Sequence, residues 1–495
     1  MKYIGLDVGT SGCKAAVVDS DGNVFANKSR EYSFEISKGH IELNPDTVWN
    51  AVYEVLCELG PHARDAAALS VSSIGEAFVI LNDNDRPLAN GIVYLDNRSA
   101  ETLPEIAGKI AVRELYDITG MYLHQMFSLS RFVWQQKYTP KVIKEAEKFC
   151  MFGDFITYKL TGQRAIDPSS ASRTMMFDSK KREWSDRIMD LFAVPKNKFS
   201  PVMKTGTIIG SILPDLAGKT GLRRDLKVVL GCHDQCSATL GSGIYGGGML
   251  MLGEGSSESI NAVIEYNHID RDMLFSKQIA MEPYITPGEY IVPLGILQHG
   301  TAIKWFVTNN KAYYDTIPPL AGESLFARAD RLSAQDSGGL YFIPYLTRSN
   351  IMDVASCAPG CFIGLEYTSD INTMYRAVLE GLSFESKCNL LILEQTGYKP
   401  VRLVATGGGA KSSLFMQIKS DILGCKIDIP KNTDSGIIGL AMICAVAMGE
   451  YTNYAQAAER FIRIKESYTP HTGFEKRLET YTKINKAIKE LYNTI

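Results

Sequence analysis

Residues 3–19, YIGLDVGTSGCKAAVVD, decide the fold that we predict for this chain of 495 residues. Two apolar runs flank the short polar turn GTSG, as expected of two antiparallel strands. Asp21-Gly22 follows as a strong hairpin signal, and residues 24–26 begin a third strand. The chain is therefore predicted to open as a β-meander with a glycine-rich turn after its first strand.

This first turn carries groups that suit a phosphorylated ligand. Glycine lets the backbone approach a bulky anion, and the hydroxyls of Thr10 and Ser11 can bind phosphate oxygens together with exposed amides. Lys14 adds a positive charge, and Asp7 at the strand end can hold Mg²⁺ through water. An ordinary hairpin with solvent-facing polar residues would have the same letters. The spacing matches neither Walker A nor Gly-x-Gly-x-x-Gly, which disfavours those two nucleotide folds.

A second segment, Gly231-Cys232-His233-Asp234-Gln235, places an acid after a short buried strand predicted at 227–231. A helix of small residues is predicted at 236–240, so Asp234 lies beside a helix N-terminus, which favours the ionised carboxylate. Such a carboxylate is suited to accept a proton from a substrate hydroxyl. The alternative is that Asp234 only caps the helix.

Two further glycine-rich turns lie in the second half of the chain. The segment 406–412 (TGGGAKS) stands between a predicted strand and a helix that Ser412 or Ser413 caps and that stops at Gly424. The segment 253–257 (GEGSS) is a turn of the same kind. Glycines before a helix N-terminus suit close approach of a nucleotide, and a plain connector is the alternative. Together the turns and the strand-end acid predict a cleft in which both halves hold ATP and one carboxylate serves the acceptor.

Composition excludes several classes of protein. With 45% hydrophobic and 22% charged residues, the chain has the make-up of a globular protein and not of a disordered or fibrous one. A net charge of −3 gives no basic surplus for nucleic acid or an anionic membrane. The first residues do not resemble a signal peptide, and the longest uncharged apolar run, 435–449, is too short for a membrane span. We therefore expect a cytoplasmic protein, without nucleic-acid or membrane partners, whose ten cysteines are reduced.

Glycines at 241, 243 and 246–248 mark a flexible boundary. We expect two domains, residues 1–245 and 246–495, with a mostly helical insertion between about 100 and 200. A strand, glycine turn and strand at 249–264 weakly repeat the N-terminal pattern, which fits two domains of related architecture. Long helices are predicted at 45–59, at 372–395 with Asn372 as its cap, and over 474–495.

These segments together resemble the FGGY carbohydrate kinases of the actin/hexokinase-like superfamily, in order and over nearly the whole chain. The resemblance is carried by GLDVGTS (5–11), YLDNR (94–98), DF and LTG (154–155, 160–162), DPSSAS (167–172), GCHDQ (231–235), RAVLEG (376–381) and GGGAKS (407–412). It implies an α/β fold of two actin-like (ribonuclease H-like) domains with a central nucleotide and sugar cleft. It also implies phosphorylation of a sugar, polyol or sugar-acid hydroxyl by ATP, with Mg²⁺ as the metal.

The resemblance also implies roles for single residues. Asp234 falls on the family's catalytic base and Asp7 on its metal-linked acid. The implied ATP-binding positions are Thr10, Ser11 and Lys14 in the first phosphate loop, Ser256 near the second, Gly300 and Lys304 in a nucleotide-contacting turn and helix, and Gly408, Gly409 and Ser412 on the adenosine side. The implied sugar-binding positions are Gly75, Glu76, Asp96, Arg98, His233 and Gln235.

The sugar side departs from better-known members of the family. Gly75-Glu76 stands where xylulokinases tend to have Met-His and glycerol kinases have Arg-Glu, and Tyr94 replaces the usual Trp. The usual Gly-Glu-Arg after the second-domain strand is reduced to residues 346–349 (LTRS). The substrate prediction therefore rests on the overall layout more than on these positions.

That layout is xylulokinase-like and favours a ketopentose such as xylulose. Gluconate or another sugar acid, a linear polyol and an autoinducer sugar are the alternatives. Glu76 would accept hydrogen bonds from hydroxyls and repel an anionic substrate, unless Arg98 or Arg348 compensates; the other reading is a structural glutamate at a strand end.

Two functions of other classes stay open from the sequence, a non-catalytic sugar sensor on the same fold and an actin- or chaperone-like ATPase. The expected ligands are a small sugar and ATP. The sequence leaves open whether the chain forms a homodimer.

Overall fold

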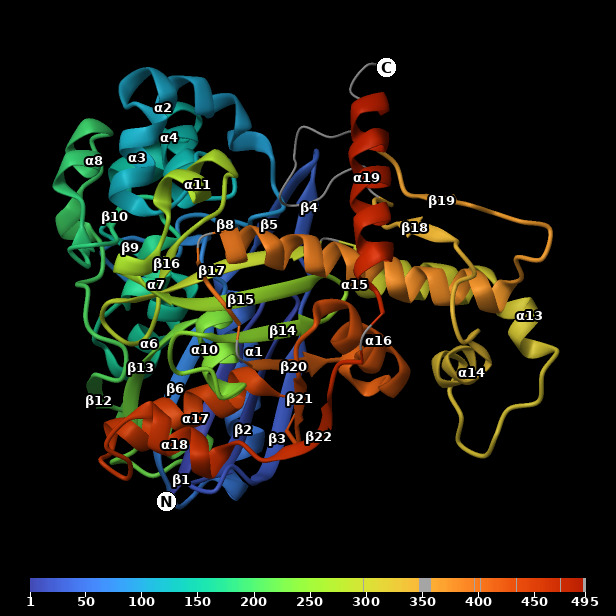
Figure 1. The fold of residues 1–495 in the computed structure, drawn as a ribbon. Helices are drawn as coiled ribbons and strands as arrows, with labels where there is room; N and C mark the ends of the chain where they lie inside the picture. Colours follow the sequence, from blue (N-terminus) through green and yellow to red (C-terminus); the bar gives the residue numbers. More distant parts are fainter. Residues whose placement is uncertain are drawn as a thin grey trace. The chain divides into compact units, whose positions relative to one another are not determined.

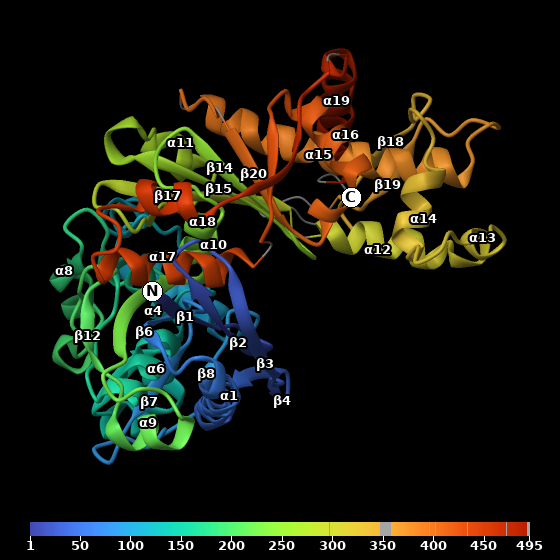
Figure 2. The same ribbon diagram turned by 90° about the horizontal axis from the view of Figure 1, so that it is seen from below.

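The computed structural model describes residues 1–296, 298–346, 358–395, 397–400, 402–432, 434–471 and 473–492. The chain forms two compact units, drawn as a ribbon from two directions in Figure 1 and Figure 2. Unit 1 comprises Met1–Tyr245, Ala280–Ile291 and Asp434–Arg463; unit 2 comprises Gly246–Ile279, Val292–Thr433 and Ile464–Ile495. Within the described residues, the helices are all too short or too polar to cross a membrane.

Unit 1 is built on a six-stranded sheet of order β12-β13-β6-β1-β2-β3. Its strands are β1 (Lys2–Val8), β2 (Gly12–Asp19), β3 (Val24–Glu31), β6 (Ala66–Ser73), β12 (Ile208–Ser211) and β13 (Lys227–His233). β1, β2 and β3 pair antiparallel, which confirms the predicted meander. β6 lies between β1 and β13 and runs parallel to both, so three neighbouring strands end at one edge of the sheet.

Helices bury the apolar positions of this sheet. α1 (Pro45–Leu59) has the predicted bounds because Asn44 caps its first turn and Val48, Val52, Val55 and Leu59 form one buried face. The helices α6 (Phe152–Thr161), α10 (Asp234–Gly241) and α17 (Ser435–Ala447) also pack on this sheet, while α9 (Pro214–Thr220) packs on α1 and α18 (Tyr454–Phe461) packs on α10 and α17.

The helix α17 belongs to unit 1, although it lies far along the chain, and Figure 1 shows it in red beside the blue β1. Glycine allows this close packing. A Cβ on Gly241 would lie 1.8 Å from the Ser435 carbonyl oxygen, and one on Gly439 would lie 2.0 Å from the Ser237 carbonyl oxygen. The segments 280–291 and 434–463 thus return to unit 1, which a single sequence boundary at 245/246 does not describe.

The predicted helical insertion surrounds small sheets in unit 1. Its helices are α2 (Leu103–Lys109), α3 (Val112–Thr119), α4 (Ser128–Tyr138), α5 (Pro140–Glu145), α7 (Pro168–Ser172) and α8 (Asp186–Leu191). The short strands of this unit are β4 (Glu35–Ser37), β5 (His40–Leu43), β7 (Phe78–Leu81), β8 (Gly91–Ile92), β9 (Lys148–Met151), β10 (Phe177–Asp178), β11 (Glu183–Trp184) and β16 (Glu282–Pro283).

Unit 2 repeats the strand pattern of unit 1, as the weak sequence repeat predicts. The strand order β17-β15-β14-β20-β21-β22 combines an antiparallel β14–β15 pair with parallel β14–β20 and β20–β21 pairs. The strands are β14 (Met249–Glu254), β15 (Glu258–Glu265), β17 (Glu289–Ile296), β20 (Arg402–Gly407), β21 (Ile427–Pro430) and β22 (Ile464–Tyr468), with β18 (Tyr341–Ile343) and β19 (Cys361–Ile363) as a separate pair.

The helices of unit 2 include two predicted caps with different outcomes. α16 (Ser413–Leu423) is capped by Ser412 and ends at Gly424 in the left-handed conformation, as predicted. α15 (Ile371–Gln395) is not capped by Asn372; Asp370 accepts from the Thr373 N–H instead, two residues earlier. The remaining helices are α11 (Arg271–Ser276), α12 (His299–Asn309), α13 (Lys311–Asp315), α14 (Leu325–Leu332) and α19 (Glu475–Tyr492).

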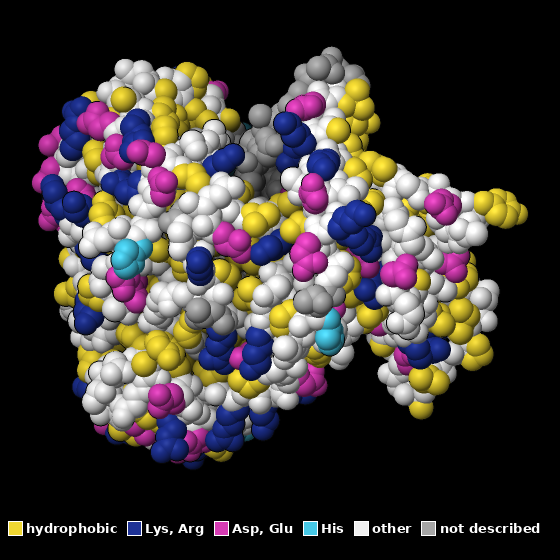
Figure 3. All heavy atoms as spheres, viewed as in Figure 1, with side chains coloured by type: hydrophobic (Ala, Val, Ile, Leu, Met, Phe, Trp, Pro, Cys, Tyr) yellow, Lys and Arg dark blue, Asp and Glu magenta, His cyan; other side chains and the backbone are white. Residues whose placement is uncertain are grey.

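The surface in Figure 3 carries acidic and basic side chains interspersed over the face drawn. The nine described cysteines are thiols without a disulfide bond; Cys357 and Arg348 lie outside the described residues.

Candidate active site

Three parallel strands of unit 1 place their polar residues at one edge of the sheet. Asp7 of β1 is opposite Ser72 of β6, and His233 of β13 is opposite Ser73. Because carboxyl ends of neighbouring parallel strands meet, the segments that follow them converge there, which is where open α/β sheets bind ligands. Glu76 and Asp234 are in those following segments.

The first glycine turn is ordered by backbone and ion-pair contacts. The Gly9 N–H donates to the Gly12 oxygen at 2.9 Å, which closes the turn that carries Thr10 and Ser11. The Lys14 ammonium lies 2.7 Å from Asp434 Oδ1 and 3.8 Å from Asp7 Oδ2. Asp434 is a partner that the sequence analysis missed, because it lies in the second half of the chain without a local motif.

Asp7 is a poorly solvated carboxylate. Its Oδ1 accepts from the Ser72 hydroxyl at 2.7 Å. Burial raises its pKa to about 6; Lys14 opposes this shift and the charge of Asp234 adds to it.

Asp234 is the first residue of α10 and does not cap it. The cap position is His233, and no side-chain cap bond is formed there. Asp234 Oδ1 is buried without a hydrogen-bond partner, while the side chain as a whole is 31% exposed. Its pKa is raised chiefly by burial; the charge of His233 opposes this shift and that of Glu76 adds to it. An acid at this place without a capping role is available for chemistry.

Next to Asp234 lies a buried chain of alternating charges. His233 Nε2 is 3.2 Å from Asp234 Oδ1, and His233 Nδ1 is 2.8 Å from Glu282 Oε1. Arg173 reaches Glu282 at 3.5 Å and donates from Nε to Glu76 Oε1 at 2.9 Å, with a second N–H to the same oxygen. Burial opposes the ionisation of Glu76, but the charges of Arg173 and His233 outweigh it and hold the pKa of Glu76 below its usual value.

Gly75 leaves the space that the side chain of Arg173 occupies. A Cβ on Gly75 would lie 2.6 Å from Arg173 Cγ and 3.0 Å from His233 Cδ2. Arg173 directly follows the quoted segment 167–172, so that motif pointed to its neighbourhood, whereas Glu282 has no local signal.

The side chains of Asp96 and Arg98 are hydrogen-bonded to each other. Arg98 donates from Nε to Asp96 Oδ1 at 2.9 Å and from NH2 to Oδ2 at 2.6 Å, and its NH1 donates to Glu42 at 2.7 Å. The guanidinium also stacks over Trp134 at 5.1 Å. Gln235, also predicted to bind the sugar, is a half-buried residue of α10.

In unit 2, six residues predicted to bind ATP line one pocket of about 370 Å³. They are Ser256, Gly300, Lys304, Gly408, Gly409 and Ser412. Glu254, Gly255, Ile303, Phe326, Asp330, Tyr375, Leu379 and Phe415 complete the lining. The pocket exists because β14 and β20 run parallel, with Glu254 opposite Gly407, so that both glycine turns lie at the same sheet edge.

Gly300 holds one wall of this pocket. Its N–H donates to the Gly255 oxygen at 3.2 Å, and a Cβ on Gly300 would lie 2.3 Å from that oxygen. We therefore expect Gly300→Ala to push the 255–256 turn away and to raise KM for ATP about tenfold or more, since small misplacements at a binding site are costly. Steady-state kinetics at saturating sugar measure this. Gly108→Ala is the control, because a Cβ there would meet open space, and it should leave KM unchanged. Gly288→Ala would not serve, because Gly288 has a positive φ.

Beneath the pocket lies a buried cluster around Lys419. Its ammonium donates to Glu254 Oε1 at 2.6 Å and to Glu258 Oε2, and His299 Nε2 is 3.1 Å away. Burial raises the pKa of Glu254 to about 7 despite Lys419, and burial lowers that of His299. Glu254, Glu258 and His299 are close enough to hold a metal ion, but the lysine already supplies the cation between the two carboxylates.

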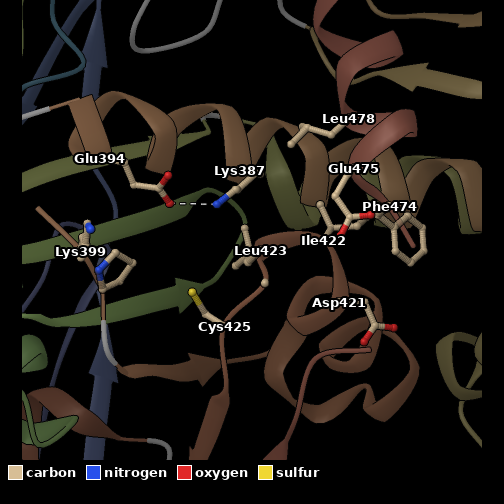
Figure 4. Close-up of a pocket in the computed structure, with 12 residues that line it drawn as sticks. Lys387, Glu394, Lys399, Asp421, Ile422, Leu423, Cys425, Phe474, Glu475 and Leu478 are labelled. Carbon is tan, nitrogen blue, oxygen red and sulfur yellow. Dashed lines mark hydrogen bonds and ion pairs between the residues drawn. The ribbon is translucent and has the colours of Figure 1, made fainter. Parts of the chain in front are cut away.

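A larger pocket of about 570 Å³ in unit 2 carries none of the predicted residues. Figure 4 shows Lys387 directed at Glu394, with a 2.9 Å ion pair, and Cys425 nearby. Pocket size therefore does not mark the residues predicted to bind ATP, which lie where the two glycine turns of unit 2 meet.

Comparisons with known proteins test the family resemblance. The model of the FGGY family of carbohydrate kinases, N-terminal domain, matches residues 2–241, and that of the C-terminal domain matches residues 267–448. The xylulose kinase of Bacillus subtilis (strain 168) is 26% identical over 506 residues, which cover 99% of each chain. The autoinducer-2 kinase of Enterobacter sp. (strain 638) is 26% identical and covers 95% of this chain and 91% of its own.

A solved structure of a xylulose kinase also has this fold. The crystal structure of ligand-bound xylulose kinase from Lactobacillus acidophilus is 25% identical and superimposes with a TM-score of 0.86, covering 100% of this chain and 98% of the other. These matches confirm the predicted α/β class with two actin-like domains and the predicted phosphotransfer from ATP to a carbohydrate. The chain belongs to the FGGY family of carbohydrate kinases.

Proposed function

We propose that this kinase transfers the γ-phosphoryl group of ATP to a hydroxyl of an uncharged ketopentose such as xylulose. The observation that carries the proposal is Asp234, a strand-end carboxylate that does not cap its helix and keeps part of its side chain exposed. Relatives over the full chain length that bear the name xylulose kinase support the choice of sugar.

Asp234 acts as the general base in this proposal. Because Oδ1 is buried against His233, Oδ2 is the oxygen that an acceptor hydroxyl can reach. Oδ2 accepts the hydroxyl proton, the hydroxyl oxygen forms a bond to the γ-phosphorus, and the bond from phosphorus to the bridging oxygen breaks, which releases ADP.

The glycine turns hold the nucleotide. Thr10, Ser11, Lys14 and Ser256 are assigned to phosphate oxygens. The other pocket residues bind the rest of ATP, with Lys304 as the pocket's cationic side chain and Gly408, Gly409 and Ser412 on the adenosine side.

Asp7 suits a Mg²⁺ ion bound through water. Its Oδ1 is occupied by Ser72, whereas Oδ2 meets Lys14 only at 3.8 Å, so one hard oxygen is available. When bound there, Mg²⁺ supplies charge neutralisation for the triphosphate.

The sugar side favours an uncharged acceptor. Arg98, one of the two arginines that could bind a substrate carboxylate, is paired with Asp96 and Glu42. Glu76 lines this side with a negative charge, and we assign it together with Gln235 to sugar hydroxyls. His233 faces carboxylates at both ring nitrogens, so we assign it to Asp234 and not to the sugar. We also propose a cytoplasmic location and a homodimer.

An ADP-release assay with a panel of acceptors tests the substrate. We expect xylulose or a related ketopentose to give kcat/KM at least about tenfold above gluconate and above linear polyols, as differential binding of hydroxyls allows. A preference for gluconate would contradict the ketopentose assignment, and no stimulation by any sugar would favour a sensor.

A further inference from the structure

Glu282 is buried beside the active-site histidine. It lies on β16, is 1% exposed, and directs Oε1 to His233 Nδ1 at 2.8 Å. The Cys236 thiol donates to the same oxygen at 3.2 Å, and Arg173 is 3.5 Å from Oε2. Each carboxylate oxygen of Glu282 therefore faces a donor.

The imidazole of His233 has a carboxylate at each end. Asp234 Oδ1 is 3.2 Å from Nε2, opposite Glu282 at Nδ1. A neutral imidazole carries one N–H, so either tautomer would leave a nitrogen lone pair facing a carboxylate oxygen. The two close carboxylates favour the imidazolium, whose Nδ1 faces Glu282 and whose charge lies 3.2 Å from Asp234 Oδ1. Consistent with this, the carboxylates of Glu282 and Asp234 outweigh burial and raise the pKa of His233 to about 9.

We propose that Glu282 is a positioning residue for phosphoryl transfer: it holds His233 as an imidazolium whose charge keeps Asp234 Oδ1 beside it, at 3.2 Å, and leaves Oδ2 to the acceptor. Glu282 touches neither sugar nor nucleotide in this proposal and acts through His233. The inference rests on the proposed role of Asp234 as the base.

The charges around Asp234 explain why the charge state of His233 affects the ionisation of Asp234. Glu76 and Glu282 disfavour its ionised form, and Arg173 and His233 favour it. The charge of Asp234 adds to the burial that raises the pKa of Asp7. The charges of Glu76 and Asp234 likewise add to the burial that raises the pKa of Tyr94. His233 is the cation in direct contact with Asp234, so loss of its proton leaves a base that is protonated more readily.

Glu282→Gln removes the charge and keeps the shape. We expect the His233 pKa to fall from about 9 by ~1–3 pH units, because one adjacent carboxylate shifts a titrating group by that amount. The alkaline limb of kcat/KM should move down with it. We expect kcat to fall about tenfold and KM for ATP to change less than about twofold, the signature of an effect on the chemical step.

Two variants separate charge from packing. Glu282→Asp keeps the charge and should restore the wild-type alkaline limb in part. Cys236→Ala removes a neighbour of Glu282 without changing charge and should leave the profile unchanged.

The readouts are the pH profile with the best acceptor of the panel and an NMR titration of the His233 imidazole in the full chain, assigned with His233→Asn. The NMR titration needs no substrate, so it decides the charge state even if the ketopentose assignment fails. A neutral His233 at pH 7 in the wild type would overturn the inference. A loss of kcat in Glu282→Gln with the alkaline limb in place would show a packing role only and would also overturn it.

Discussion

Asp234→Asn is expected to lower kcat about 10²–10⁴-fold, the range that a positioned general base contributes. Asparagine fills the same volume but cannot accept the hydroxyl proton at neutral pH. Because Asp234 is assigned to the acceptor hydroxyl and is not among the pocket residues assigned to ATP, the Kd of ATP should stay close to that of the wild type. Single-turnover kinetics and ATP titration by calorimetry measure the two effects.

Asp186→Asn is the matched control. Asp186 is also the first residue of a helix, α8, but is exposed and paired with Lys196 at 2.5 Å. The same chemical change there should leave kcat unaltered. Turnover at the wild-type level in Asp234→Asn would remove the base assignment, while loss of ATP binding would point to a structural role.

Lys419→Met is expected to destabilise unit 2 by ~3–5 kcal/mol, the usual cost of removing one partner from a buried ionic cluster. Lys419, Glu254 and Glu258 are fully buried, so the two carboxylates would be left close together without a cation. Ser386 still donates to Glu258, but one hydroxyl cannot replace a charge. Glu254 lines the nucleotide pocket, so KM for ATP should rise as well.

Urea unfolding at pH 8, above the pKa of about 7 of Glu254, gives the free energy of unfolding. Lys483→Met is the control, because that lysine is 74% exposed in its pair with Glu479, and surface pairs contribute about 0–1 kcal/mol. Adding Glu258→Gln to Lys419→Met should recover part of the loss, since it removes one uncompensated charge. A Lys419→Met protein as stable as the wild type would contradict this account of the cluster.

Elements with a local signal were predicted well. α1 follows from its apolar spacing and the start of α16 from its serine cap, because both signals act within one or two helical turns. The cap of α15 was placed two residues late, at Asn372 instead of Asp370, because both residue types serve as caps and the choice depends on where the first turn closes.

The predicted site residues show the same limit. The glycine turns converge in one pocket because strands β14 and β20 are parallel neighbours, as the motif order suggested. Asp96, Arg98 and His233 were assigned to the sugar from their motifs, yet the structure gives their polar atoms to protein partners. A motif fixes which residue is present, whereas only packing decides what it faces.

The sequence by itself determined the α/β class, the two glycine-turn repeats, the kinase family and the strand-end acid Asp234, because each depends on patterning over short stretches. Only the tertiary structure decided that α17 returns to unit 1, that Glu282 meets His233, and that Lys419 lies between Glu254 and Glu258. Those pairs are separated by many residues, and a charge carries no signal of its partner along the chain. Burial, which raises or lowers each pKa in the site, is likewise a property of the folded protein alone.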